Sequence, residues 1–109
     1  MLFIDKSGEV KRKLDELLKV AFVEVGLTME ANAKQEITSL GAVDTGNLRN
    51  SITNRPNKYS VVVGTAVEYG KYVEFGTSRM VERPFLRNTI LNHEGQYRQI
   101  IESHLQELD

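Results

Sequence analysis

The chain has 109 residues, the length of one domain, and its 40% hydrophobic and 27% charged residues are an ordinary composition for a folded protein. Its 14 basic and 15 acidic residues give a net charge of -1, which is not the basic excess expected of a dedicated nucleic-acid binder. The absence of cysteine excludes disulfides, thiolate catalysis and cysteine zinc sites, and no apolar run approaches the roughly 20 residues of a membrane span.

The first predicted element is a long amphipathic helix from Ser7 to Leu40. Its apolar residues recur at steps of three and four, which places them on one stripe of a helix. They are Val10, Leu14, Leu17, Leu18, Ala21, Val25, Met29, Ala33, Ile37 and Leu40. Ser7 is suited to cap the start and Gly41 to follow the end. Gly26 lies in the interior, where glycine costs about 1 kcal/mol, and it marks a point where the helix would bend or break.

The length of this helix predicts a partner. About 30 residues at about 1.5 Å each make about 45 Å, which exceeds the diameter of a compact domain of this size. An unbroken helix would therefore protrude, and a protruding amphipathic helix needs a surface to cover it. We infer self-association from this feature.

The middle of the chain predicts a β-hairpin. After a loop at residues 42–47, Leu48, Asn50 and Ile52 alternate with polar residues, as in a half-buried strand. A turn is expected at residues 55–58, and a second strand, rich in β-branched residues, at residues 59–66. The apolar stretch at residues 67–75 fits either a short helix or a strand.

A polar connection at residues 76–83 leads to a last predicted helix at residues 84–108. Pro84 suits the first helical turn, where its missing N–H group costs nothing. The chain thus reads as a helix (7–40), a hairpin with a short element (47–76) and a helix (84–108). This order predicts a single α+β domain over residues 1–109, with the C-terminal helix on one face of a small antiparallel sheet.

The sequence contains no specific catalytic or metal-binding pattern. His93 and His104 are eleven positions apart, too far to share one ion, because a helical metal pair needs a spacing of three or four. Nothing in the sequence brings any two of Asp44, Glu68 and Glu74 together as an acid–base pair. The three glycines spaced six apart from position 64 match no phosphate-binding loop. We therefore expect no cofactor and no enzymatic activity.

Three segments together resemble a known family. They are residues 43–52, VDTGNLRNSI; residues 66–77, AVEYGKYVEFGT; and residues 83–87, RPFLR. They are similar to the gene-product-ten-like proteins of HK-type siphophages, which serve as tail-completion, tail-to-head joining or minor structural components of long-tailed phages and prophages. The resemblance covers about residues 40–90. The connection before Arg83 is shorter than in many relatives, so the conformation of residues 78–82 stays open.

The resemblance implies a structural role. Such proteins assemble at the neck or tail terminus, commonly as sixfold rings, and contact connector and tail-tube subunits. It therefore implies a virion protein that resides in the bacterial host cytoplasm before assembly, with itself, connector or head-completion proteins and tail-tube proteins as partners. It implies neither a cofactor nor a catalytic residue.

Most residues of these motifs are expected to define the fold. Asp44 is suited to an Asx-turn that ends in Gly46, and Arg49 either meets Glu68 or Glu74 or stays exposed without a fixed partner. The residues given a fold-defining role are Asp44, Thr45, Gly46, Leu48, Tyr69, Tyr72, Glu74, Gly76, Pro84 and Phe85. The residues assigned to a candidate interface are Arg55, Lys58, Ser78, Arg79, Met80 and Arg83.

Two alternative functions make distinct demands on the fold. A small nucleic-acid-binding regulator needs its basic residues on one face, and a small hydrolase needs a cleft with two perturbed carboxylates. The basic residues in question are Lys58, Arg79, Arg83 and Arg87. The same residues are compatible with DNA passing through a ring lumen without sequence-specific contacts.

Overall fold

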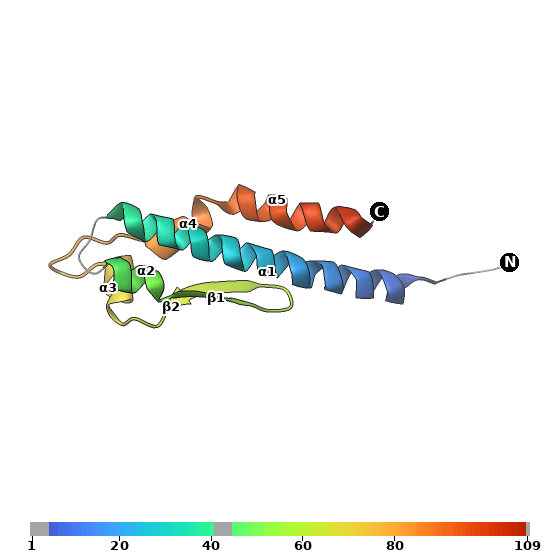
Figure 1. Cartoon of the computed structure of the whole chain (residues 1–109), viewed down its shortest axis with the longest axis horizontal. Coiled ribbons are helices and arrows are strands. Elements are labelled where there is room, and N and C mark those ends of the chain that lie inside the picture. The colour runs from blue at the N-terminus through green and yellow to red at the C-terminus, as the bar shows by residue number, and fades with distance from the viewer. Residues whose placement is uncertain (1–4, 41–44, 109) are drawn as a thin grey trace.

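A computed structural model describes residues 5–40 and 45–108 of the chain. Helix α1, Ser7–Leu40, runs through all 34 residues without a break and forms the long axis of the molecule (Figure 1). The predicted helix is confirmed, but its cap precedes Ser7. The Asp5 carboxylate accepts a hydrogen bond from the Ser7 N–H at 2.9 Å, and the Lys6 carbonyl accepts one from the Val10 N–H at 3.0 Å. Gly41, the expected C-terminal glycine, lies outside the described residues.

Gly26 does not break α1, which continues through this position. A Cβ atom at this position would clash with the Asn54 side chain and would lie 3.3 Å from Val61 Cγ1. Both of these residues belong to the hairpin. Glycine therefore lets the Asn54 side chain of the hairpin approach the helix backbone closely.

The hairpin is formed by β1, Ile52–Pro56, and β2, Val61–Thr65, which pair antiparallel from Ile52 with Thr65 to Pro56 with Val61. The predicted hairpin is confirmed. Its connection is residues 57–60 rather than 55–58, because β1 continues to Pro56 and β2 begins only at Val61. The Asn57 N–H closes this turn by donating to the Ser60 carbonyl at 2.7 Å.

The predicted strand before the turn was wrong at its beginning. Residues Thr45–Asn50 form a short helix, α2, and the strand begins only at Ile52. Leu48 and Ile52 are both 2% exposed. Their spacing of four fits strand alternation and a helical step equally well, so the periodicity did not distinguish the two. Asp44 lies outside the described residues, and its expected Asx-turn with it.

The rest of the chain is helical. Helix α3 is Tyr69–Phe75, α4 is Phe85–Leu91, α5 is Glu94–Leu105, and η1 is a final 3-10 turn at Gln106–Leu108. The ambiguous apolar stretch is thus a helix. The single predicted helix over residues 84–108 was wrong, because it is interrupted between α4 and α5. Pro84 precedes α4 instead of lying within its first turn, and its carbonyl accepts the Asn88 N–H at 2.9 Å.

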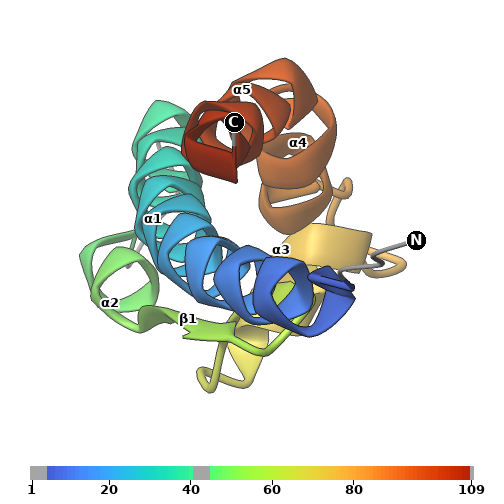
Figure 2. The same ribbon diagram turned by 90° about the vertical axis from the view of Figure 1, so that its right-hand side faces the viewer.

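The break between α4 and α5 lets the two helices take different positions. Asn92 is the C-cap residue of α4, and His93, with a φ of -124°, is the N-cap residue of α5. Helix α5 then lies along α1, while the hairpin lies against another side of α1 (Figures 1 and 2). Because α5 and the hairpin both bury an apolar face against α1, the long helix lies at the centre of the α+β fold.

Two clusters of buried side chains form the core. The first joins the C-terminal part of α1 to α2, β1, α3 and α4, through Ala33, Ile37, Leu48, Ile52, Val73 and Phe85. The second joins the middle of α1 to α5 through Val25, Met29 and Tyr97, with Val61 and Val63 of β2 packed against it.

The molecule is elongated, with extents of 73 × 22 × 21 Å. The N-terminal part of α1 projects beyond both the hairpin and α5 (Figure 1). The predicted helix protrusion is therefore present. None of the helices in the described ranges has the length and apolar character needed to cross a bilayer.

Candidate assembly surfaces

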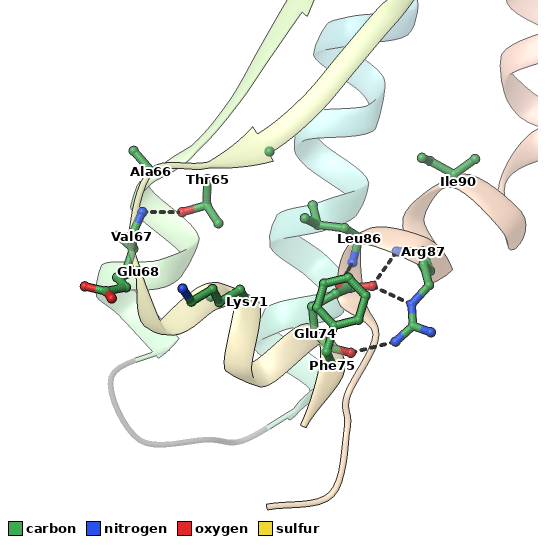
Figure 3. A pocket seen from close by; sticks show the side chains of 12 residues that line it. Thr65, Ala66, Val67, Glu68, Lys71, Glu74, Phe75, Leu86, Arg87 and Ile90 are labelled. Atoms are coloured by element: carbon green, nitrogen blue, oxygen red, sulfur yellow. Dashed lines mark hydrogen bonds and ion pairs between the residues drawn. The ribbon is translucent and has the colours of Figure 1, made fainter. Parts of the chain in front are cut away.

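A buried glutamate connects α3 to α4. Glu74 is 3% exposed, and its carboxylate accepts hydrogen bonds from the backbone N–H groups of Leu86 at 2.7 Å and Arg87 at 3.2 Å (Figure 3). These amides belong to the first turn of α4, where N–H groups have no partner within the helix. A negative charge is also favourable at this end of a helix. Glu74 therefore caps α4 from a different helix.

Arg87 completes this connection. Its Nε donates to the Glu74 carboxylate at 2.8 Å, and its Nη2 donates to the Glu74 backbone carbonyl at 2.6 Å and to Glu82 at 3.1 Å. These hydrogen bonds, with Glu74 first and Glu82 second, raise the pKa of Arg87. The guanidinium carbon lies 5.2 Å from the centre of the Phe75 ring. One side chain thus ties α3, the connection after it and α4 together.

Arg49 is not the partner of Glu74, which pairs with Arg87. Arg49 was expected to meet Glu68 or Glu74, or to stay without a fixed partner, but its Nη1 lies 3.4 Å from Thr38 Oγ1 on α1. The Glu74–Arg87 pair joins two of the three family-like segments. Sequence analysis singled out both residues without pairing them, because thirteen positions and an irregular connection separate them.

The connection between α3 and α4 folds back onto Gly76. This residue has φ 74° and ψ 177°, and a Cβ atom there would lie 2.7 Å from both the Glu82 nitrogen and the Met80 oxygen. Thr77 and Met80 exchange backbone hydrogen bonds at 2.8 and 3.2 Å. The conformation of residues 78–82, which the sequence left open, is therefore a tight turn against the end of α3.

An apolar groove of about 730 Å³ lies between the end of β2, α3 and α4 (Figure 3). Residues 64–67 form one border, and Phe75 and Ile90 are exposed on the other borders, with 66% and 44% of their surface accessible. Glu68, Lys71 and Arg87 carry the exposed charges that line it, together with the buried Glu74. No spacing in the sequence indicated this groove.

A buried polar cluster fastens α5 to α1. The Tyr97 hydroxyl donates to the Thr89 carbonyl at 2.7 Å and accepts from Asn32 Nδ2 at 3.0 Å, while the same amide donates to Gln96 at 3.0 Å. Burial raises the pKa of Tyr97 above its ordinary value of 10.0. The only sign of this cluster in the sequence is the polar Asn32 on the apolar stripe of α1.

Replacement of Tyr97 by phenylalanine is expected to lower the free energy of unfolding by about 1–2 kcal/mol, because two buried groups lose a hydrogen-bond partner. Urea denaturation followed by circular dichroism measures this difference. Tyr59→Phe is the matched control, because the Tyr59 hydroxyl donates to Asp15 on the surface and its loss should change stability by less than about 0.5 kcal/mol. Equal effects of the two substitutions would contradict the structural role of the cluster.

The stability difference between the parent protein and Tyr97→Phe should depend on pH. Since the pKa of Tyr97 is higher in the folded chain than in the unfolded chain, the folded state holds this proton more firmly. The stabilisation by Tyr97 is complete below pH 10 and is lost as the pH rises through the folded pKa. The stability difference between the parent protein and Tyr97→Phe should therefore shrink above pH 10.

The two histidines have separate partners on α1. His93 Nε2 lies 3.8 Å from Glu36 Oε1, and His104 Nε2 contacts the carboxylate of Glu24. Over residues 5–40 and 45–108, no group of three side chains is arranged to hold a metal.

The residues given a fold-defining role occupy different environments. Leu48 and Phe85 are in the core, with 2% and 1% exposure, and Tyr69 packs against the same cluster. Tyr72 is 43% exposed beside Lys71, whose Nζ lies 5.2 Å from its ring centre. Thr45 begins α2, and Gly46 follows within that helix.

The candidate interface residues do not form one surface. Arg55 and Lys58 are exposed on the hairpin, where Lys58 Nζ lies 3.7 Å from Asp15 of α1. Ser78, Arg79, Met80 and Arg83 are exposed in the connection before α4, at the other end of the hairpin from its tip (Figure 1). The basic residues therefore divide between two regions, which does not favour a nucleic-acid interface. Both Glu74 carboxylate oxygens are occupied by hydrogen bonds, which does not favour an acid–base role.

A family model described as "Bacteriophage HK97-gp10, putative tail-component" matches residues 3–76. The chain belongs to this HK97-gp10-like family. The match includes α1, α2, the hairpin and α3 and ends at Gly76, the residue that terminates α3. Membership of this HK97-gp10-like family supports a phage structural role for the chain, as a tail component. Neither a search of curated proteins nor a search of solved structures found a match.

Proposed function

We propose that this chain is a head–tail joining or tail-completion subunit that acts without catalysis at the neck of the virion. Subunits repeat around an axis, near sixfold, and the ring contacts connector or head-completion proteins on one side and tail-tube proteins on the other. The chain resides in the bacterial host cytoplasm before assembly. DNA passes through the ring lumen without sequence-specific contacts.

The elongated shape with apolar surface in two separate regions carries this proposal. The groove lies beside the C-terminal part of α1, where α3 and α4 pack. A second apolar strip, Val20, Val23 and Leu27, is exposed on α1 away from the core, with 55%, 44% and 58% of each residue accessible. Exposed apolar surface of this kind is typical of protein–protein contacts. Unlike patches on one subunit produce head-to-tail contacts, which close into rings when the rotation permits.

Light scattering across a concentration series, with negative-stain images of large species, tests the proposal. We expect a ring-sized species near six subunits, either for the chain alone or after addition of the phage's connector and tail-tube proteins. A chain that stays monomeric throughout and binds neither protein would overturn it. Leu27→Ser should reduce any self-association, whereas Gln99→Ser, an exposed polar substitution on α5, should not.

A further inference from the structure

We infer that the groove between β2, α3 and α4 receives the apolar segment Leu2–Ile4 of a second copy of this chain. The inference rests on the proposed ring assembly and supplies the contact between neighbouring subunits. Three observations support the inference: the chemistry of the groove, the chemistry of the segment, and the distance that separates them within one chain.

The groove offers apolar contact beside the end of a strand. Phe75 and Ile90 are large exposed hydrophobic residues, and Val67 and Leu86 are half-buried beneath them. Strand β2 pairs with β1 only, as far as the described residues show, and its end lines the groove (Figure 3). An unpaired strand edge presents N–H and C=O groups that an extended segment can bind, although the N–H and C=O groups of Val67 are already bonded to Thr65 and Gly70.

The sequence provides one short segment of matching chemistry. Leu2, Phe3 and Ile4 are three consecutive large apolar residues, followed by the charged Asp5 and Lys6. In an extended segment successive side chains point to opposite sides, so Leu2 and Ile4 would face one border of the groove and Phe3 the other. Asp5 follows directly and is complementary in charge to Lys71 at the groove margin.

The segment cannot reach the groove of its own chain. The groove lies next to the part of α1 that packs against α3 and α4, around Ala33. From Ser7 to Ala33 the helix rises about 39 Å at about 1.5 Å per residue. Residues 2–4 with their linker to Ser7 extend at most about 20 Å at about 3.5 Å per residue. This segment can therefore reach only the groove of a neighbouring subunit.

Cysteine cross-linking tests the contact directly, because the chain contains no cysteine. Chains with Phe3→Cys are mixed with chains carrying Ile90→Cys and oxidised. We expect a disulfide-linked pair on non-reducing gels. The matched control mixes Phe3→Cys with Gln99→Cys, an exposed position on α5, and should give at least tenfold less product. Equal yields, or no product from either mixture, would overturn the inference.

A peptide measurement separates this inference from the proposed function. Fluorescein-labelled Leu-Phe-Ile-Asp-Lys is titrated with a chain lacking residues 2–4, and binding is followed by anisotropy. We expect saturable binding that weakens at least tenfold with Ile90→Asp and stays unchanged with Gln99→Asp. Rings without peptide binding or cross-links would overturn the inference and leave the proposed function intact. Specific peptide binding by a chain that forms no ring and binds no phage protein would support the inference and contradict the proposed ring assembly.

Discussion

Replacing Glu74 by glutamine should lower the free energy of unfolding by about 2–4 kcal/mol, as measured by urea denaturation. Glu74 is 3% exposed and accepts three hydrogen bonds, two from the first turn of α4 and one from Arg87 Nε. Glutamine keeps the size of the side chain but turns one acceptor oxygen into an NH₂ group. At least one buried donor then loses its partner, and the charge that stabilises the helix N-terminus is lost.

Glu82→Gln is the matched control for this prediction. Glu82 also accepts a hydrogen bond from Arg87, at 3.1 Å, but its side chain is 53% exposed. Exposed pairs of this kind contribute about 0–1 kcal/mol, so the control should remain close to the parent protein. If Glu74→Gln were as stable as Glu82→Gln, the cap on α4 would not be what joins α3 to α4.

Replacing Gly76 by alanine should lower the free energy of unfolding by about 3–5 kcal/mol. The combination of φ 74° and ψ 177° lies in a region of backbone conformation that is essentially restricted to glycine, at a cost of about 1–3 kcal/mol for other residues. The added Cβ would also lie 2.7 Å from two backbone atoms, Glu82 N and Met80 O, and backbone shifts of this kind cost about 1–3 kcal/mol.

Gly95→Ala provides a control of opposite sign. Gly95 lies within α5, and nothing is within 4 Å of the Cβ that alanine would add. Alanine favours the helix over glycine, so this variant should be more stable by about 0.5–1 kcal/mol. Thermal unfolding of both variants checks the pair of predictions. A Gly76→Ala protein as stable as its parent would mean that residues 76–82 do not hold this tight turn.

Residue patterns within single segments were sufficient for several elements. The steps of three and four from Val10 to Ile37 predicted α1, because burial on one face of a helix requires that spacing. The β-branched strand and the turn before it predicted the hairpin, although the turn was displaced by two residues. The tail-component family was also evident from the segments around Thr45 and Glu74.

Tertiary contacts decided what those patterns left open. Leu48 and Ile52 fitted both a helix and a strand, and packing into the core around Phe85 selected a helix followed by a strand. The continuous apolar pattern after Pro84 concealed the break at His93, where α5 turns to lie along α1. Local periodicity cannot report such a change of direction.

The sequence by itself thus determined the long helix, the hairpin and the family, because each depends on interactions between residues close together in the chain. Only the tertiary structure decided the cap that Glu74 places on α4, the close approach of the hairpin to Gly26 and the groove bordered by Phe75 and Ile90. These features join residues that are distant in the chain. Their existence depends on how the elements pack, and no spacing along the sequence encodes that directly.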